Sequence, residues 1–319
     1  MEIISNPTQV EIKKAAQALK DGHLVAFPTE TVYGLGADAT NQVAVNRVYS
    51  VKNRPLNHPL IVHISNVKKL PLWASGVTPQ AISLAEYFWP GPLTLVLPSV
   101  QSTRQFLAGD QNFVAIRVPS NKIGRQLLVN FENLGGQGVV APSANKFGAV
   151  SPTDSSAVRE ELGENLGPQD VLIDGGRCEV GIESTIVRCS KDGESILRPG
   201  VITKSQIEAI TKRELLNENF SPEIQVSGTL PKHYSPNAKV LINGDPLPGE
   251  GLIALSEIYS DPSVHRLASP NNSTEYAQQL YRALRYGDQM NLKTIRVILP
   301  SEGEFSEGIC DRVKKAANQ

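Results

Sequence analysis

Cysteine is scarce in this 319-residue sequence, which contains three, Cys178, Cys189 and Cys310. No two of them form a CxxC pair, so zinc sites of the usual spacing are excluded. Their odd number also argues against a disulfide framework of the kind found in small secreted domains. We therefore expect no metal bound by the protein itself and a reducing compartment, the cytoplasm.

Long apolar runs and an excess of either charge are missing as well. No apolar stretch approaches the ~18–20 residues of a membrane span, and the N-terminal MEIISNPTQVEIKK has no apolar signal core. We therefore expect no membrane partner. The 31 basic and 32 acidic residues leave a formal charge of −1, which provides no broadly basic surface for nucleic acid.

Helical and strand patterns alternate along the chain, which predicts an α/β fold. Hydrophobic residues make up 40% of the sequence, too many for a disordered chain, and the length suits two domains. Thr8 with Glu11 predicts a helix that begins with a capping box, and Thr78-Pro79 predicts a second helix start. Two more helices are predicted at 43–51 and 154–162. Predicted strands cover 24–27, 93–97, 114–118, 139–141, 171–173 and 185–187.

Residues 211–238 lack sustained periodicity and are interrupted by proline and glycine, which predicts an interdomain linker. A small second α/β unit follows it. Its predicted strands cover 240–242, 252–255 and 294–299, and its predicted helices start near 273 and 305.

Several polar segments come directly after predicted strands, where open α/β sheets place ligands. The longest, FPTETVYGLG at 27–36, is neither a P-loop nor a GxGxxG motif, and a turn with bonded hydroxyls explains it equally well. Lys52 and Arg54 lie at the end of a predicted helix. They either cap that helix or clamp a phosphate, the lysine as a point charge and the arginine as a fork.

Arg117 and His63 stand within apolar segments. Arg117, in VAIRV, must find an anion or reach solvent, because an unpaired buried cation is costly, and this favours a site residue. A histidine such as His63, in LIVHI, is more often a core residue. Hydroxyl and amide groups also follow strands in APSAN (141–145), GIEST (181–185) and LRPG (197–200), where turns and caps are the ordinary explanation.

Together these segments resemble the YrdC-type threonylcarbamoyl-AMP synthases, in the longer form with an additional C-terminal domain. The family's motifs occur in order as FPTETVYGLG, KNRP, PLIVHI, WPGPLT, VAIRVP, APSAN followed by SPT, IDGG, ESTI and LRPG. The resemblance continues in PKHYSP (231–236), which is similar to a lid-like segment of the long form, and in YAQQLYRALRYGDQM. VSGTL at 226–230 departs from the family's glycine-rich, basic run.

The resemblance implies a twisted mixed-sheet YrdC-like catalytic domain at 1–205, a linker or lid at 206–238, and a small Rossmann-like α/β domain at 239–319. It implies that L-threonine, bicarbonate and ATP, the last with Mg²⁺, become threonylcarbamoyl-AMP and pyrophosphate. In this nucleotidyl transfer a carbamate oxygen attacks the α-phosphate. A partner complex then passes the threonylcarbamoyl group to an adenosine of tRNA.

The resemblance also implies roles for individual residues. Lys52 and Arg54 are expected to form a catalytic phosphate clamp. The L-threonine site is expected to contain Thr31, His63, Arg117, Ser143 and Ser184. The ATP site is expected to contain Arg54, His58, Phe113, Asn145, Thr153, Arg198 and Tyr234, with His58 and Phe113 the weaker candidates. Tyr234 on the linker would close over the nucleotide and exclude water from a mixed anhydride.

Other classes of function stay open at this point. A plain RNA-binding module fits the concave face of a YrdC-like domain, although the near-neutral charge argues against it. The carbamoyl-transfer enzyme of hydrogenase maturation contains a similar domain, but three scattered cysteines cannot build its zinc fingers. A regulatory protein that senses threonine or nucleotide is a third alternative.

Overall fold

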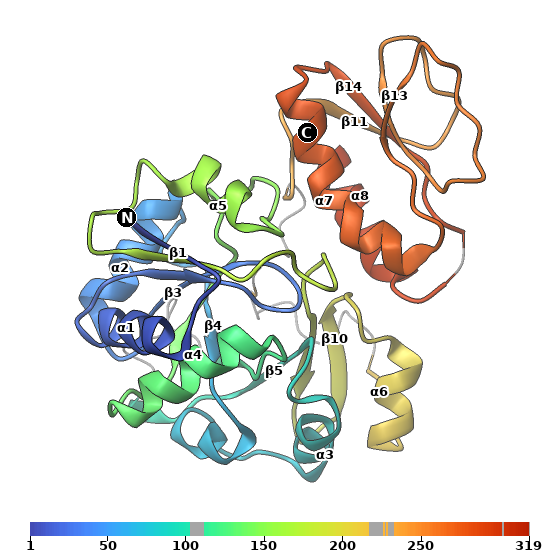
Figure 1. Ribbon diagram of the computed structural model, residues 1–319. Helices are drawn as coiled ribbons and strands as arrows, with labels where there is room; N and C mark the ends of the chain where they lie inside the picture. Colours follow the sequence, from blue (N-terminus) through green and yellow to red (C-terminus); the bar gives the residue numbers. More distant parts are fainter. Residues whose placement is uncertain (103–111, 217–225, 227, 229–232, 302, 319) are drawn as a thin grey trace.

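The structure is a computed structural model and describes residues 1–319 except 103–111, 217–225, 227, 229–232, 302 and 319. It contains two α/β bodies, a larger one formed by the N-terminal two thirds of the chain and a smaller one, orange to red in Figure 1. The described residues form one sheet in each body. This confirms the predicted α/β class.

The sheet of the larger body is mixed and has ten strands. They are β1 (Glu2–Ser5), β2 (Val25–Phe27), β3 (Gly34–Asp38), β4 (Ile61–His63), β5 (Leu93–Pro98), β6 (Phe113–Arg117), β7 (Val139–Val140), β8 (Val171–Asp174), β9 (Thr185–Cys189) and β10 (Glu194–Arg198). Their order is β1-β8-β2-β3-β7-β4-β6-β5-β9-β10. Strands β4 and β6 pair in parallel, so the ends of both, at His63 and Arg117, lie side by side.

Helices cover both faces of this sheet. They are α1 (Gln9–Lys20), α2 (Gln42–Lys52), α3 (Pro79–Phe88), α4 (Lys122–Asn133), α5 (Ser155–Leu162) and α6 (Lys204–Thr211), with a 3-10 helix at Val67–Leu72. Alternate residues of a strand point to opposite faces. In β2, Val25 and Phe27 therefore pack with α1 and α4, whereas Ala26 belongs to the core that contains α2 and α3.

Local sequence signals set the helix ends. Thr8 and Glu11 form the predicted capping box of α1. Helix α2 ends at Lys52, and Asn53 then takes the left-handed conformation with φ of 50°, as is common directly after a helix. This cap separates Lys52, on the helix, from Arg54, on the loop that follows.

The smaller sheet contains four parallel strands in the order β11-β14-β12-β13. Its elements are β11 (Lys239–Ile242), β12 (Gly251–Ile253), β13 (His265–Ala268), α7 (Ser273–Gln289), β14 (Thr294–Val297) and α8 (Ser306–Ala317). The apolar stripe of α7, which includes Tyr276, Leu280 and Leu284, packs into the core of this body. Throughout the described part of the chain, no helix has the length and apolar character needed to cross a bilayer.

The two bodies pack directly against each other. The core of the smaller one includes Val32, Val150 and Ile182 from the larger one. A glycine permits the close approach, because a Cβ on Gly181 would lie 2.4 Å from the carbonyl oxygen of Ala277 in α7. Helices of the C-terminal domain thus rest on loops of the larger domain.

Several elements have no counterpart in the sequence-based prediction, among them β1, β3, β10 and α4. In β3 the reason is physical, because a Cβ at Gly36 would lie 2.9 Å from the ring of Phe27. Close packing requires glycine at this position, and because glycine is typical of turns, the composition of the segment does not predict a strand. The predicted domain limits at 205 and 238 stay a prediction, since part of the linker lies outside the described residues.

Asp170 connects distant parts of the larger domain. Its carboxylate accepts hydrogen bonds from the N–H groups of Leu24 at 2.8 Å and Gly167 at 2.7 Å, and it pairs with Arg47 at 2.6 Å. We predict that Asp170→Ala lowers the free energy of unfolding by about 3 kcal/mol, because two main-chain donors lose their acceptor. Urea denaturation checks this value.

The exposed Asp21, at the end of α1, provides the control for this change. Asp21→Ala is expected to change the free energy of unfolding by less than about 0.5 kcal/mol. Equal losses of unfolding free energy in the two variants would show that the contacts of Asp170 do not stabilise the fold.

Candidate active site

One cavity of the larger domain gathers polar groups from segments that are distant in the sequence. The space between these groups, which includes a part open to solvent, measures about 530 Å³. The polar side chains that line it are Thr29, Thr31, Tyr33, Arg54, His63, Arg117, Ser143, Glu183, Ser184, Arg198, His233 and Tyr234. Most stand at strand ends or on the loops that follow them.

Arg117, the last residue of β6, pairs with an anion of its own chain. Its guanidinium lies 2.7 Å from the carboxylate of Glu30, and the two side chains are 5% and 3% exposed. Nη1 donates to the hydroxyl of Thr31 at 2.9 Å, and Nε donates to the carbonyl of Gly91 at 3.3 Å. A guanidinium has five N–H donors, so these three contacts leave up to two for a ligand.

Thr29 and Thr31 belong to a tight turn after β2. The hydroxyl of Thr29 donates to the carbonyl of Val32 at 2.6 Å and accepts from the N–H groups of Thr31 and Val32, both at 3.2 Å. The hydroxyl of Thr29 therefore bonds the loop backbone, as the turn explanation expects, and the loop also lines the cavity. The role of the segment toward a ligand stays a prediction.

His63, at the end of β4, is a neutral imidazole next to Arg117. Burial, reinforced by the charge of Arg117, lowers its pKa to about 3. Within the part of the chain that the structure describes, its Nδ1 has no hydrogen-bond partner. Buried polar atoms are normally bonded, so this nitrogen is suited to a small polar ligand.

Ser184 and Arg198 form a second polar pair. The hydroxyl of Ser184 lies 2.8 Å from the hydroxyl of Thr94 in β5. Nη2 of Arg198, at the end of β10, donates to the carbonyl of Ser184 at 2.8 Å and to its hydroxyl at 3.2 Å. Burial lowers the pKa of Arg198. The pair presents a hydroxyl next to a guanidinium.

Lys52 lies behind the cavity wall and is not one of its lining residues. Its ammonium donates to the main-chain carbonyls of Ser143 and Asn145, and burial lowers its pKa. The side chain is 1% exposed. Lys52 therefore fixes the turn that carries Ser143 against the end of α2.

Arg54 reaches the cavity from the loop after α2. Burial lowers its pKa to about 10, so the guanidinium is charged at neutral pH. It donates to the carbonyls of His58 at 3.3 Å and Pro59 at 2.9 Å, and its Cζ lies 5.5 Å from the centre of the Phe147 ring. The cation is thus oriented by carbonyls and by an aromatic face.

His233 and Tyr234 line the cavity from the linker. Their rings are 4.1 Å apart, and Tyr234 stacks on Tyr281 of α7 at 5.7 Å. Tyr234 is 1% exposed and has a φ of 59°, a conformation that packing must maintain in a residue other than glycine. Burial lowers the pKa of His233 to about 3, so both rings are uncharged at neutral pH.

The cavity has a positive balance of charge. Three arginines line it, whereas Glu183 is the one carboxylate among its described lining residues. Burial alone would raise the pKa of Glu183, but Arg312 and then Arg198 bring it to about 2. Guanidinium groups in such a setting bind carboxylates and phosphates.

A metal-binding cluster is not found in the described ranges of the chain, where no three His, Cys, Asp or Glu side chains converge. Glu183, which lines the cavity, accepts hydrogen bonds from Ser151, Tyr281 and Arg312. Glu30, which lies next to the lining, pairs with Arg117. These residues do not fit a divalent ion that is held by the protein itself.

The structure brings all five residues predicted for the threonine site to the cavity, Thr31, His63, Arg117, Ser143 and Ser184. Of those predicted for the ATP site, it places Arg54, Arg198 and Tyr234 there. Lys52, His58, Phe113, Asn145 and Thr153 are not part of the lining. The role of each residue toward a ligand stays a prediction.

The positions of Phe113, His58 and Asn145 have physical explanations. Phe113 starts the strand that Arg117 ends, and its ring packs under Arg188 at 5.8 Å. The ring of His58 lies 5.1 Å from that of Phe147. The amide of Asn145 donates to two carbonyls of its own turn.

Five polar residues that line or adjoin the cavity have no predicted role, Thr29, Glu30, Tyr33, Glu183 and His233. Glu30 could have been inferred, because Arg117 requires an anion and FPTETVYGLG contains one acidic residue. Glu183 and His233 stand inside GIEST and PKHYSP, but nothing in their spacing reveals their partners.

Comparison with known proteins covers both domains. The family model for Sua5, YciO and YrdC proteins, described as "Telomere recombination", matches residues 17–200. A second model, described as "Threonylcarbamoyl-AMP synthase, C-terminal domain", matches residues 202–318.

Individual relatives agree with these matches. The threonylcarbamoyl-AMP synthase of Pyrococcus abyssi is 33% identical, over 96% of this chain and 94% of that protein. The Bacillus subtilis protein of the same name is 38% identical, over 76% of this chain and 68% of that protein. A crystal structure of P. abyssi Sua5 complexed with L-threonine has a TM-score of 0.86 at 31% identity, over 99% of this chain and 97% of that one. E. coli YciO, at 22% identity and a TM-score of 0.54, shares the fold of the larger domain.

The low pKa of His63 makes stability depend on pH. Its pKa falls from 6.5 in an ordinary setting to about 3 in the folded protein, so the unfolded chain binds more protons between these values. Stability is therefore lost as the pH falls below about 6.5. We predict that His63→Asn reduces the loss of unfolding free energy between pH 7 and pH 5.5 by about 1 kcal/mol relative to wild type.

Urea denaturation at the two pH values measures this difference. His233, whose pKa is lowered in the same direction, continues to contribute in the variant, so part of the pH dependence remains. The same pH dependence in His63→Asn and wild type would contradict the assignment of a neutral, buried imidazole.

Proposed function

Because this chain belongs to the threonylcarbamoyl-AMP synthase family, we propose that its cavity makes threonylcarbamoyl-AMP from L-threonine, bicarbonate and ATP. The observation that carries the proposal is the meeting of hydroxyls, a neutral imidazole and three guanidiniums in one cavity. Threonine offers a carboxylate, an amine and a hydroxyl, and ATP offers phosphates. This set of side chains is complementary to both.

We assign threonine to the side of the cavity around Arg117. The donors that Arg117 has left after Glu30, Thr31 and Gly91 suit the substrate carboxylate. The hydroxyls of Thr31, Ser143 and Ser184 suit its hydroxyl and amine. A neutral His63 does not repel an amine and can accept a hydrogen bond from it.

We assign ATP to the side of Arg54, Arg198 and Tyr234. The two guanidiniums neutralise phosphate charge, and Tyr234 covers the nucleotide. For His58, Asn145 and Thr153 we propose supporting roles through the loops that carry them, and for Phe113 through strand β6. Lys52 supports the proposed phosphate clamp only indirectly, because its ammonium holds the turn of Ser143 and Asn145 behind the wall, whereas Arg54 reaches the cavity itself.

The proposed chemistry is a nucleotidyl transfer in two bond-forming steps. The amine of threonine attacks bicarbonate and forms a carbamate with loss of water. A carbamate oxygen then attacks the α-phosphorus of ATP, the bond between the α-phosphorus and its bridging oxygen breaks, and pyrophosphate leaves. Such a reaction depends on alignment and on neutralising charge at the phosphates. The arginines of the cavity supply that charge.

Mg²⁺ belongs to the substrate in this proposal. The cavity has no group of described carboxylates that fits the ion, so Mg²⁺ would enter with the triphosphate and be bound mainly by its oxygens. The residues of the chain then act on the phosphates through their own N–H groups.

Closure by the linker and the C-terminal domain suits a product that water destroys. A mixed anhydride between a carbamate and AMP is readily hydrolysed, and the buried rings of His233 and Tyr234 exclude water from one side. The product would pass to a transfer complex that modifies tRNA. The free thiols of Cys178, Cys189 and Cys310 agree with a reducing compartment, and we propose the cytoplasm.

Burial of the arginines argues against a plain RNA-binding module. Arg54, Arg117 and Arg198 are 7%, 4% and 3% exposed, so a polynucleotide backbone cannot reach them from the surface. A small molecule that enters the cavity can.

Arg54→Ala tests the phosphate clamp. We predict that threonine- and bicarbonate-dependent release of pyrophosphate falls by about 10²-fold or more, because a preorganised cation at the phosphates is lost. Arg159→Ala, which removes an exposed arginine of α5, is the matched control and should retain wild-type rates. Circular dichroism verifies folding. Wild-type rates in a folded Arg54→Ala protein would remove Arg54 from the reaction.

Substrate analogues test the threonine side. A site that bonds a substrate hydroxyl leaves its own polar groups unpaired when the hydroxyl is missing, so valine should lower kcat/KM by about 10⁴-fold. Serine lacks one methyl and should lower it by about 10–200-fold. Pyrophosphate release with each amino acid gives these ratios. A better rate with valine than with serine would contradict the assignment of the hydroxyl contacts.

A further inference from the structure

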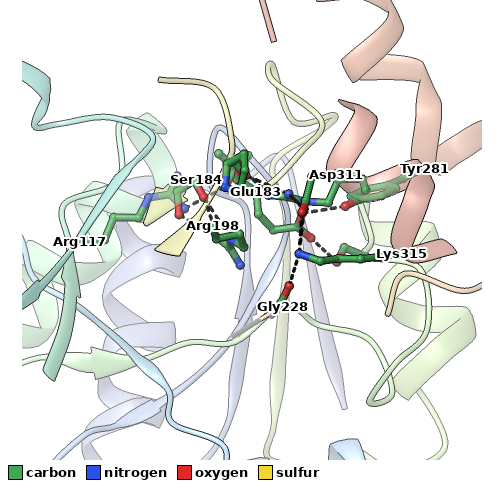
Figure 2. A network of polar contacts seen from close by, with 12 residues as sticks. Arg117, Glu183, Ser184, Arg198, Gly228, Tyr281, Asp311 and Lys315 are labelled. Atoms are coloured by element: carbon green, nitrogen blue, oxygen red, sulfur yellow. Dashed lines mark hydrogen bonds and ion pairs between the residues drawn. The ribbon is translucent and has the colours of Figure 1, made fainter. Parts of the chain in front are cut away.

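Glu183 is a buried carboxylate at the junction of the two domains. It is 6% exposed and directly precedes Ser184. Its carboxylate accepts hydrogen bonds from the hydroxyl of Ser151 at 2.6 Å, the hydroxyl of Tyr281 at 2.7 Å and Nε of Arg312 at 2.8 Å. Tyr281 and Arg312 belong to α7 and α8, so the C-terminal domain provides two of these three donors. Figure 2 shows Glu183 and Tyr281 within this polar network.

Arg312 contacts several segments of the cavity wall. Its side chain is 0% exposed, and Nη1 donates to the carbonyl of Pro199 at 2.9 Å. Its Cζ lies 5.2 Å from the centre of the Tyr234 ring. Pro199 directly follows Arg198, just as Glu183 directly precedes Ser184. One side chain of α8 thus holds the neighbours of two proposed site residues.

Helix α8 is fixed against this wall on both sides of Arg312. A Cβ on Gly308 would lie 2.9 Å from the carbonyl oxygen of Gly200, so glycine is required for the close approach. Lys315 donates to the carbonyl of Gly228 at 2.8 Å. The helix can therefore transmit its position to the cavity lining.

The contact between Arg312 and Glu183 is an ion pair and not only a packing contact. A buried carboxylate is costly unless it is paired, and removal of one partner leaves that cost uncompensated. The charged groups around Glu183 are Arg312 and Asp311 of α8, Arg198 of β10 and Lys315, which pairs with Asp311. Arg312 is the cation that touches the carboxylate of Glu183 directly.

We propose that Arg312 is a positioning residue of the active site. By neutralising Glu183 and holding the carbonyl of Pro199, it fixes the two segments that carry Ser184 and Arg198. The C-terminal domain then completes the site and does not merely cover it. This inference rests on the proposed function, because it names what holds the proposed substrate contacts in place.

Arg285 provides a matched control for domain docking. It also reaches from the C-terminal domain to the larger one, where it pairs with Glu161 of α5 at 3.1 Å and donates to the carbonyl of Val150. These contacts hold α5 and the segment at Val150, whereas Arg312 holds the segments next to Ser184 and Arg198.

The experiment compares Arg312→Met, Arg312→Lys and Arg285→Met in the full chain. Calorimetric titration gives the Kd for L-threonine without turnover, pyrophosphate release gives KM and kcat, and thermal unfolding gives Tm. Arg312→Met is expected to raise the Kd for threonine about 10-fold or more, and Arg312→Lys, which keeps the charge, to recover part of that loss. Arg285→Met is expected to lower Tm but to change the Kd by less than about twofold.

Glu183→Gln tests whether the effect passes through the carboxylate. With the charge removed, Arg312→Met no longer leaves an unpaired anion. The double variant should therefore bind threonine about 10-fold more tightly than Arg312→Met alone. Strictly additive changes would overturn the proposed route through Glu183.

Equal threonine affinity in wild type and Arg312→Met, or equal losses in Arg312→Met and Arg285→Met, would also overturn the proposal. If Arg312→Met does not fold, Arg312→Lys decides the question. An ammonium cannot reproduce the fork of the guanidinium, so the Kd should still rise, and an unchanged Kd contradicts the proposal. A wild-type protein that binds threonine but forms no adenylate would reject the proposed function while the threonine Kd values still test Arg312.

Discussion

A carboxylate buried between two domains must be neutralised, and the rest of this site depends on how Glu183 meets that requirement. Its donors come from Ser151 in the larger domain and from Tyr281 and Arg312 in the smaller one. The same arginine contacts the ring of Tyr234 and the carbonyl of Pro199. One ion pair therefore links the docking of the domains, the course of the linker and the end of β10.

The cavity combines fixed positive charge with neutral polar groups. Its arginines are each oriented by partners of their own chain, Glu30 for Arg117 and main-chain carbonyls for Arg54 and Arg198. The two histidines that line it are neutral, because burial lowers the pKa of each to about 3. Such a site attracts anions without repelling an amine. Its groups need little reorganisation when charge develops at a phosphate.

Sequence reasoning works best where a local signal is sufficient. The capping box at Thr8 and the strand around Arg117 lie where they were expected, and the five residues predicted for the threonine site line one cavity. It fails where tertiary contacts decide. The glycines of β3 are typical of turns, so its sequence does not predict a strand. The two carbonyls that Lys52 contacts belong to a turn about ninety residues away. Arg312 lies 129 residues from Glu183. No periodicity links such residues, because domain docking creates the pairing.

The proposed reaction is tested most directly by following carbon from bicarbonate into the product. The full chain is incubated with ATP, L-threonine and ¹⁴C-labelled bicarbonate, and the products are separated at once, before a mixed anhydride hydrolyses. We expect a labelled compound that contains AMP, forms with an equal amount of pyrophosphate and requires threonine. Pyrophosphate or AMP released without incorporation of label, or label incorporated without threonine, would contradict it.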